Sequence, residues 1–302
     1  MQNPAPIALF VYNRPDHTRR TLQYLKQNEL AGQSLLFIFS DAAKEESQKE
    51  MVQEVRDIID DVDGFKHVEV IKRNRNLGLA DSIIDGVSRL TREFGNVIVF
   101  EDDLICSEYT LTYFNDALKR YEKEERVMHI GAYMYPLKTD HLPQTFFYRA
   151  ATSWGWATWD RAWKSFEPDI DKLISQFDAQ KIHRFSIEDS MNFWKQIVEF
   201  KNGRNNSWAI RWYATIFLKG GLTLNPSQSL INNIGHDGTG IHSGINDIYN
   251  VIINPRPVTY FPDKLEENPE AYLAIKQFLK TRKGNLLERG LRFLKEKFKL
   301  KH

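Results

Sequence analysis

The first hundred residues alternate between two patterns, and this alternation limits the possible folds more than any other feature of the chain. Apolar runs predict strands at 7–12, 34–39 and 97–100, and a further short strand is predicted at 67–72. Amphipathic stretches between them predict helices at 17–27, 45–59 and 79–94. Strands that alternate with helices of this length form right-handed βαβ units around a mostly parallel sheet. The sequence therefore predicts an α/β fold with a mostly parallel central sheet flanked by helices.

The second half of the chain is less regular and rich in aromatic residues. Segment 153–159, with three tryptophans in seven residues, is interpreted as a dense aromatic loop or the start of a helix. Around it we predict further strands at 145–148, 222–225 and 230–234, and helices at 109–121, 169–177, 190–200 and 208–218. A glycine-rich loop with two histidines follows at 235–244.

Composition excludes several classes of protein. A net charge of +1 gives no general attraction to nucleic acid, and the single cysteine, Cys106, excludes an internal disulfide framework. The first residues lack the pattern of a signal peptide, and no apolar run approaches the ~20 residues that span a bilayer. We therefore expect a cytoplasmic protein without a nucleic-acid partner.

The end of the chain is basic. Residues 280–302 contain nine Lys or Arg and two Glu. Their apolar residues fall at helical spacing on one face, at Leu287, Leu291, Leu294 and Phe298. Such a helix either lies on the anionic inner face of a membrane or packs its apolar stripe on the rest of the protein. Both interpretations stay open.

Three consecutive carboxylates, Glu101, Asp102 and Asp103, follow the apolar strand at 97–100. Burying anions together costs free energy unless a divalent metal or basic side chains offset their charge. Mg²⁺ prefers oxygen ligands and often keeps substrate phosphates in its shell, and α/β sheets bind ligands beyond the carboxyl ends of their strands. The simplest hypothesis is a metal–diphosphate site. The alternative is a polar cap before the next helix, because Ser107 follows.

The other predicted strands of the first half also end in polar residues. Asn13 and Arg14 follow the first strand, Asp41 follows the second, and Arg75 and Asn76 follow the third. Because the carboxyl ends of parallel strands meet at one edge of a sheet, these side chains are predicted to form a single site with the three acids.

The order of these segments resembles that of a GT-A glycosyltransferase. The segments are FSDAAK, RNRNLGLADSIIDGV, VIVFEDDL, SWGWATWDRAW and NIGHDGTGIHSG. N-acetylglucosaminyltransferase I-like enzymes and bacterial family-2-like sugar transferases are the most similar groups, over roughly residues 5–245. The resemblance implies a Rossmann-like GT-A domain at 1–265, with a nucleotide-binding half at 1–105, an acceptor half at 106–265, and a basic helical tail at 266–302.

The same resemblance implies roles for the acidic residues. Asp103 would bind Mn²⁺ or Mg²⁺, while Glu101 and Asp102 would contact sugar, ribose or metal-bound water. Asp41 would meet the nucleotide base. For Asp41, the alternative is a cap at the start of a helix.

For the remaining donor residues the resemblance implies contacts with the nucleotide. Arg75 and Asn76 would lie near base and ribose, and Asn13 and Arg14 would line the nucleotide pocket. Alternatively, Asn76 and Gly78 could form only a turn before a helix.

Residues of the second half are assigned more loosely. Trp156 would shape the donor-sugar or acceptor pocket, although core packing is the alternative for at least two of the tryptophans in its segment. Arg211 would offset phosphate charge or pair with a core acid. His242 matches the histidine that completes the metal shell in several GT-A enzymes, whereas His236 is either a ligand or a solvated loop residue.

The general base departs from the family pattern. Related enzymes often carry an aspartate within a W-D-x-x-W-like segment, but here Ala209 occupies that position, and alanine cannot accept a proton. We prefer Asp237, because it stands in the polar glycine-rich loop expected near the diphosphate. The alternatives, in chain order, are Asp160, Glu188 and Asp189.

The leading hypothesis is a metal-dependent glycosyltransferase. It would move a hexosyl or N-acetylhexosaminyl group from a nucleotide-diphosphate sugar, a UDP-sugar by preference, to a glycan or lipid-linked acceptor in surface polysaccharide synthesis. A non-catalytic nucleotide-sugar or carbohydrate-binding protein is conceivable because the expected base is missing. A nucleotidyltransferase usually has a glycine-rich loop after the first strand, where this chain has YNRPDHTRR.

Overall fold

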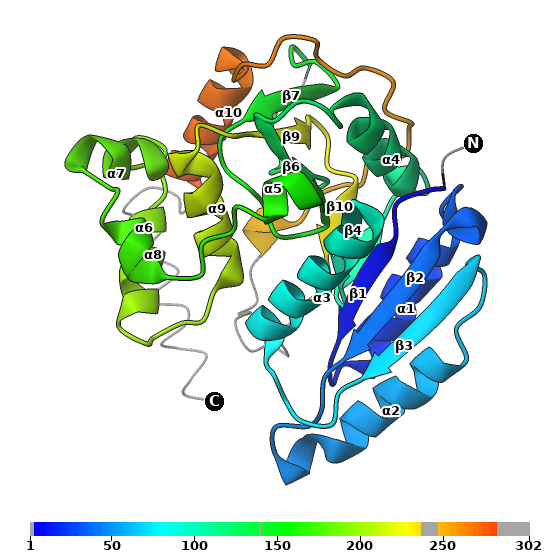
Figure 1. Cartoon of the computed structure of the whole chain (residues 1–302). Helices are drawn as coiled ribbons and strands as arrows, with labels where there is room; N and C mark the ends of the chain where they lie inside the picture. The colour runs from blue at the N-terminus through cyan, green and yellow to red at the C-terminus, as the bar shows by residue number, and fades with distance from the viewer. Residues whose placement is uncertain (1–2, 139, 237–246, 283–302) are drawn as a thin grey trace, which may run out of the picture.

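An eight-stranded sheet forms the centre of the computed structural model, which describes residues 3–138, 140–236 and 247–282 (Figure 1). Its strands are β1 (Ile7–Val11), β2 (Leu35–Ser40), β3 (His67–Lys72), β4 (Asn96–Glu101), β6 (Val127–Gly131), β7 (Thr145–Tyr148), β8 (Trp156–Trp159) and β9 (Leu222–Pro226). They lie in the order β3-β2-β1-β4-β8-β6-β9-β7, and only β8 and β7 run antiparallel to their neighbours. The prediction of an α/β fold with a mostly parallel sheet is confirmed.

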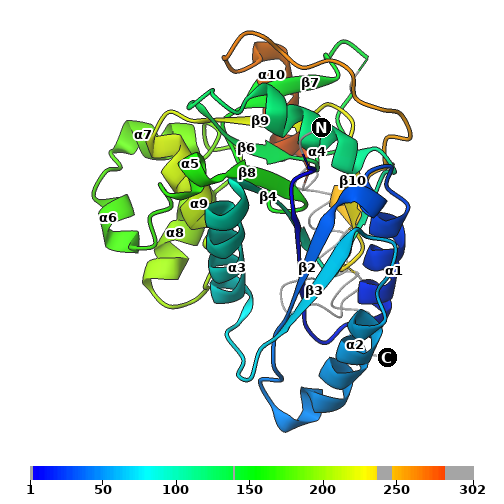
Figure 2. The ribbon, with the colours of Figure 1, turned by 45° about the vertical axis from the view of Figure 1, so that its right-hand side comes forward.

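Helices flank this sheet on both faces. They are α1 (Pro15–Lys26), α2 (Lys49–Asp60), α3 (Leu79–Phe94), α4 (Thr110–Arg120), α5 (Asp160–Trp163), α6 (Ile170–Ile174), α7 (Ala179–Phe185), α8 (Phe193–Lys201), α9 (Trp208–Leu218) and α10 (Pro269–Thr281). Figure 2 shows α1 and α2 on one side of β1 to β3 and α3 on the other. Helix α3 begins and ends where the sequence predicted, between Gly78 and Gly95, both of which have positive φ.

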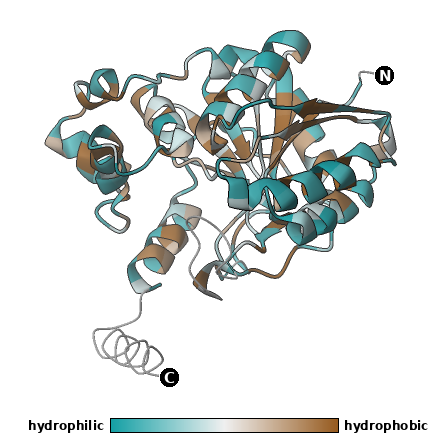
Figure 3. Cartoon of the chain, turned by 90° about the horizontal axis from the view of Figure 1, so that it is seen from below, coloured by the Kyte–Doolittle hydropathy of each residue, from teal (hydrophilic) through white to brown (hydrophobic). Residues whose placement is uncertain are grey.

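Successive side chains of each central strand point to opposite faces of the sheet, so they pack in different hydrophobic cores. In β1, Ile7 and Leu9 pack with α1, α2 and α4, whereas Ala8 and Phe10 pack with α3 and α9. Both faces of the sheet are therefore covered, and the central strands β1 and β4 are buried and mostly apolar, whereas the edge strand β3 alternates apolar and polar residues. Figure 3 shows the brown strands enclosed by helices whose outer faces are teal.

A separate two-stranded ladder joins the two halves of the chain. Strand β5 (Leu104–Cys106) follows the acidic turn and pairs antiparallel with β10 (Ile231–Asn233). The register places Leu104 opposite Asn233. This ladder carries the segment after β10 to the acidic residues.

The aromatic segment of the second half is a strand, which corrects the interpretation as a loop or helix start. Residues Trp156–Trp159 form β8, which pairs with β4 on one side and β6 on the other. Trp156 is fully buried and packs against Trp163 and Trp208, and Trp159 is also in the core. Both faces of β8 are covered, with Trp156 in one core and Ala157 and Trp159 in the other, so the segment shows no alternation of apolar and polar residues.

Helix α10 is part of the packed protein, although the sequence assigned its residues to the tail. Ala271, Ile275 and Leu279 are buried in a third core with α6 to α9. The basic segment after residue 282, including its predicted apolar stripe, lies outside the described residues. None of the helices described here has the length and apolar character needed to cross a membrane.

A buried histidine makes the stability of this core depend on pH. His129 is fully buried, and its Nδ1 accepts a hydrogen bond of 3.2 Å from the indole of Trp212. Burial lowers the pKa of His129 to about 3. The unfolded chain, with an ordinary histidine pKa near ~6.5, binds the proton first as pH falls. As pH falls from the higher of these two pKa values to the lower, the free energy of unfolding should therefore decrease. Above the higher value, His129 should have no effect on it.

His129→Gln tests this expectation. Urea unfolding at pH 7.5 and pH 5 should show a loss of stability on acidification that is about 2 kcal/mol smaller in the variant than in the parent protein. Both proteins share every other titrating group, so the difference isolates His129. Equal losses in the two proteins would contradict the assignment.

Candidate active site

The three acidic residues lie at the point where the order of the strands reverses. Strand β4 ends at Glu101, and Asp102 and Asp103 form the turn into β5. The backbone N–H of Tyr12, directly after β1, donates to Asp102 Oδ2 at 3.2 Å. The hydroxyl of Thr21 in α1 donates to the Asp102 carbonyl oxygen at 2.8 Å. The turn is thus fixed between the carboxyl ends of β1 and β4, where α/β sheets bind ligands.

Asp103 is held from both halves of the chain. Arg14 Nη1 donates to Asp103 Oδ2 at 2.8 Å, and Asn233 Nδ2 donates to Oδ1 at 3.3 Å. The N–H of Ile234 donates to the Asp103 carbonyl oxygen at 2.8 Å, and Arg14 Nη2 donates to the carbonyl oxygen of Gly235 at 3.2 Å. A Cβ at position 235 would lie 2.2 Å from Asp103 Oδ2, so only glycine allows this close approach.

The site carries more negative charge than its described cations offset. Arg14 lies 2.8 Å from Asp103 and 4.0 Å from Asp102, and it is the one guanidinium or ammonium group within 4.0 Å of these acids in the described part of the chain. Burial, followed by the charge of Asp103, raises the pKa of Asp102 to about 7. Burial and the charges of Asp103 and Asp102 raise the pKa of Glu101 well above its ordinary value. A bound cation would stabilise the charged forms of all three.

The described residues do not by themselves complete a metal shell. Across 3–138, 140–236 and 247–282, no three His, Cys, Asp or Glu side chains are grouped closely enough to hold a metal ion. The oxygens of Asp103 and Asp102 do fit Mg²⁺ or Mn²⁺, which commonly use one or two carboxylates and take phosphate oxygens and water for the rest. The donor set therefore fits a metal that binds together with a diphosphate.

Asp41 organises the loop before α3. Its carboxylate accepts the N–H groups of Ala42 at 2.9 Å, Leu77 at 2.9 Å and Gly78 at 2.8 Å, and only 6% of the residue is exposed. The side chain of Asn76 donates to the Ala42 carbonyl oxygen at 2.7 Å. Asp41 therefore fixes the backbone just before α3 without capping it, since the N-cap residue is Gly78 and no side chain caps it. Asn76 joins this loop to the loop after β2. Both oxygens of Asp41 are engaged by backbone, so a ligand would meet the loop that Asp41 shapes.

The remaining donor residues differ in their surroundings. Asn13 is half-buried in the loop between β1 and α1, and Arg75 is exposed in the loop between β3 and α3. Trp156 is in the core, as described above, and has no exposed surface for a ligand. The structure therefore places Asn13, Arg14, Asp41, Arg75, Asn76, Glu101, Asp102 and Asp103 along one edge of the sheet and leaves Trp156 inside it.

Arg211 is buried on α9, with 5% of its surface exposed. Its guanidinium lies over the rings of Phe200 and Phe166, and its Nη1 donates to the carbonyl oxygen of Pro168 at 3.3 Å. Burial lowers its pKa, and the charge of Asp81 opposes this effect. It forms no ion pair with a described carboxylate, and its buried Nη2 has no hydrogen-bond partner among the described residues. The prediction of pairing with a core acid is not met by any acid within the described residues.

The candidate bases are widely separated. Asp160 follows Trp159, which pairs with Asn96 at the start of β4, so it lies at the other end of the sheet from Asp103. Glu188 and Asp189 stand in the loop after α7, where Glu188 pairs with Lys276 at 3.0 Å and Asp189 lies 2.7 Å from His183. Asp237 and His242 lie outside the described residues.

The sequence did not predict that Asn233 and Gly235 contact the acidic turn, and it placed Trp154 only within the aromatic segment. Asn233 and Gly235 contact Asp103 and Arg14 across more than a hundred residues of sequence. Trp154 lies beside His236, with ring centroids 5.1 Å apart, one residue beyond Gly235. His236 Nε2 is buried without a partner in the described structure. The available signal was an asparagine at the end of a short strand with a glycine two residues later, but nothing local indicated which strand it would join.

A mostly parallel sheet with acidic residues at its switch point places a polar site where α/β sheets bind their ligands. Residues 7–186, more than half of the chain, match the family model described as Glycosyl transferase family 2. The chain belongs to this family. The predicted resemblance to family-2-like sugar transferases is confirmed, whereas the resemblance to N-acetylglucosaminyltransferase I-like enzymes stays a prediction.

The solved structures that match this chain are only distantly similar to it. The mannosyltransferase PcManGT from Pyrobaculum calidifontis, solved in complex with GDP-Man and Mn²⁺, is 11% identical with a TM-score of 0.39, over 72% of this chain and 71% of that one. S. aureus TarS is 14% identical with a TM-score of 0.29, over 46% of this chain and 23% of TarS. No curated protein matches the chain.

Replacing Asp41 tests its role in shaping the loop. Asp41→Ala leaves the N–H groups of Leu77 and Gly78 without their acceptor, which should cost about 1–3 kcal/mol in urea unfolding. Hydrogen exchange at these two amides should become faster. Asp41→Asn keeps one acceptor oxygen and should lose less, and Asp57→Ala, an exposed acid on α2, should change neither measurement. Unchanged exchange in Asp41→Ala would contradict the contacts described.

Proposed function

We propose that this family 2 glycosyltransferase depends on Mn²⁺ or Mg²⁺ and uses a nucleotide-diphosphate sugar, by preference a UDP-sugar, as donor. It would transfer a hexosyl or N-acetylhexosaminyl group to a hydroxyl of a glycan or lipid-linked acceptor. One observation carries the metal dependence: three adjoining carboxylates stand at the switch point, and among the described residues one guanidinium, that of Arg14, pairs with them, so that the described cations offset their charge only in part.

The acids at the end of β4 would hold the metal and meet the donor. Asp103 is the proposed ligand, with Asp102 or metal-bound water beside it and Glu101 toward the sugar. When bound, such a metal offsets the negative charge that develops on the leaving diphosphate. Arg14, which already contacts Asp103, would then share its donors between this carboxylate and a phosphate oxygen.

The loops after β1, β2 and β3 would bind the nucleotide. Asp41 keeps the loop before α3 in place, which leaves Arg75 and Asn76 at its surface to approach base and ribose. Asn13 would contact the same nucleotide from the loop after β1. Arg211 would contact the phosphates through Nη2, which has no hydrogen-bond partner among the described residues. A phosphate there would also offset the charge of this buried side chain.

Asp237 is the proposed general base. In the sequence it stands two residues after Gly235, which contacts Arg14 and closely approaches Asp103, and this proximity in the sequence supports the proposal. Asp160, Glu188 and Asp189 are less suitable, since Asp160 is at the far end of the sheet and the other two are paired with neighbouring basic side chains. His242, as a further metal ligand, rests on the sequence resemblance alone.

The setting of the reaction is proposed from the sequence. The basic segment 280–302 would bring the enzyme to the inner face of the membrane, where lipid-linked acceptors are found, and the reaction would serve surface polysaccharide synthesis.

Metal-dependent donor binding tests the site. Melting temperatures should be measured with UDP-glucose, UDP-N-acetylglucosamine and GDP-mannose, each with and without Mn²⁺. A ligand at about 100 times its Kd adds about 2.7 kcal/mol, so at least one donor should raise the melting temperature in the presence of Mn²⁺. Asp103→Ala and Asp103→Asn should lose this rise. Asp263→Ala, whose side chain is 94% exposed, should keep it.

A rise that is independent of metal, or one that persists in both Asp103 variants, would overturn the proposed site. Two variants are needed because Asp103→Ala leaves Arg14 without its closest partner, whereas Asp103→Asn preserves the shape of the side chain.

Turnover tests the base and separates the enzyme from a binding protein. With a donor identified by binding, Asp237→Asn should lower kcat by about 10²–10⁴-fold while donor affinity is retained, and Asp160→Asn should leave kcat unchanged. An unchanged kcat in Asp237→Asn would reject Asp237. Donor binding without turnover on any glycan or lipid-linked acceptor would favour the non-catalytic alternative.

A further inference from the structure

A polar cavity lies at the end of the sheet opposite to the acidic residues. It has a volume of about 460 Å³, and its walls include Arg126 before β6, Arg149 after β7 and Leu222 at the start of β9. Val127 pairs with Leu222, and Tyr148 pairs with Thr223, so these strand ends lie together. β6 and β9 run parallel to β4, whose acids are at its other end. A molecule in this cavity cannot be the donor in the proposed active site.

The charge on the walls of this cavity is positive. Four basic residues, Arg126, Arg149, Lys181 and Arg184, face two acids, Glu266 and Glu267. Both acids already have partners: Glu266 pairs with Lys264 at 2.8 Å, and Glu267 forms two hydrogen bonds with Arg149, at 2.6 and 2.7 Å. Glu266 and Glu267 therefore do not offset the charges of Arg126, Lys181 and Arg184.

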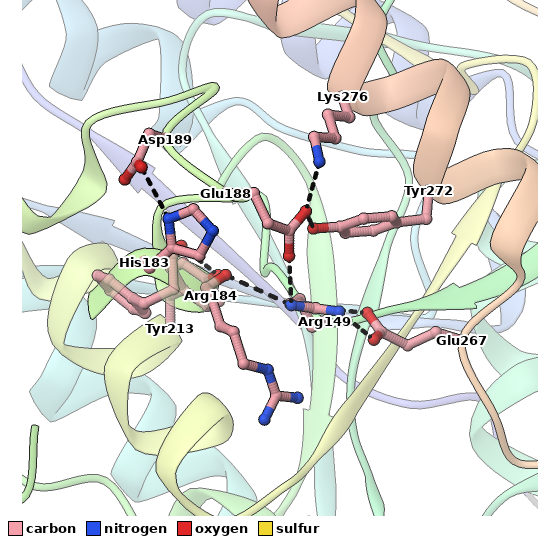
Figure 4. Close-up of polar contacts among 10 residues, drawn as sticks. Arg149, His183, Arg184, Glu188, Asp189, Tyr213, Glu267, Tyr272 and Lys276 are labelled. Carbon is pink, nitrogen blue, oxygen red and sulfur yellow. Dashed lines mark hydrogen bonds and ion pairs between the residues drawn. The ribbon is translucent and has the colours of Figure 1, made fainter. Parts of the chain in front are cut away.

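These three cations have few anionic neighbours of their own. Arg126 Nη1 donates to the Leu265 carbonyl oxygen at 3.0 Å, and Lys181 Nζ donates to that of Gln176 at 2.7 Å, with Asp178 4.0 Å away. The guanidinium of Arg184 makes no hydrogen bond or ion pair with any described residue. Figure 4 shows it extending away from the Arg149–Glu267 pair with no dashed line at its nitrogens.

A network of ion pairs fixes the loop that follows Arg184. Ile187, Glu188 and Asp189 all have positive φ, at 52°, 44° and 62°, a conformation that costs free energy in residues other than glycine. Glu188 is held by Lys276 at 3.0 Å, by Arg149 at 3.5 Å and by the hydroxyl of Tyr272 (Figure 4). These contacts outweigh the effect of burial and lower the pKa of Glu188, so it stays charged. These contacts thus hold the loop that follows Arg184 in one conformation.

We propose that this basic cavity binds the phosphate group of a ligand other than the sugar donor. Arginine forks match the oxygens of a phosphate, and a phosphate held between Arg126 and Arg184 would satisfy donors that have no described carboxylate partner. Phe217 and Leu218 add apolar surface beside the cations, which suits a phosphate that is esterified to a larger group. The phosphate can belong to a soluble ester or to the headgroup of an anionic lipid.

Calorimetry on the full chain in EDTA tests this site without using the metal-dependent one. Inorganic phosphate and glycerol 3-phosphate are the soluble probes, and vesicles of phosphatidylcholine with or without phosphatidylglycerol are the lipid probe. Arg184→Glu should weaken binding by about tenfold or more, whereas Arg184→Lys should retain most of it. Arg20→Glu, the same charge change at an exposed residue of α1, should have no effect on the soluble probes.

The outcomes distinguish the two sources of phosphate. Binding of soluble probes that Arg184→Glu weakens supports a phosphate-ester site. Vesicle binding alone supports a lipid headgroup only if Arg184→Glu weakens it more than Arg20→Glu does, because the basic segment after residue 282 attracts the same vesicles. No binding of any probe, or equal effects of the two variants, overturns the proposal. So does loss of phosphate binding in Asp103→Ala, since that would locate the phosphate in the other site.

Discussion

The hydrogen-bonded contact of Arg14 with Asp103 is the interaction on which the rest of the site depends. It joins the loop after the first strand to the acidic turn after the fourth and leaves the remaining carboxylates only partly compensated. Burial and mutual repulsion raise the pKa of Glu101 and of Asp102, so a further positive charge would stabilise their ionised forms. The surrounding contacts, from Tyr12 and Asn233, keep the turn in one shape despite this repulsion.

The first half of the fold could be predicted because its signals are local. Each parallel strand is an apolar run between turn residues, and α3 lies between two glycines whose positive φ marks its ends. The candidate residues along the carboxyl edge follow from the same logic, since parallel strands place their ends together. Residue types were therefore sufficient to place Arg14, Asp41 and Asp103 at this edge, although not to say that Arg14 and Asp103 touch across 89 residues.

The rest depended on contacts between distant segments. The four residues of β8 are buried because the strand lies inside the sheet and helices cover both of its faces, and neither the paired strands nor the helices can be read from the segment itself. For the same reason Trp156 was predicted in a pocket and is found in the core. Asn233 meets Asp103 across 130 residues, and only the β5–β10 pairing brings them together. Arg211 was identified as a charged residue of interest, but its environment of aromatic rings and backbone oxygens required the folded structure.

The short ladder of β5 and β10 ties the geometry of the acidic turn to the late part of the chain. Leu104, one residue after Asp103, is paired in register with Asn233, and the chain leaves β10 directly over the carboxylates. A displacement of β10 by one pleat would carry Gly235 away from Asp103 and put a larger residue in its place. The halves of the molecule are therefore not exchangeable modules: a different second half could be grafted onto the first only if it reproduced this small antiparallel pair.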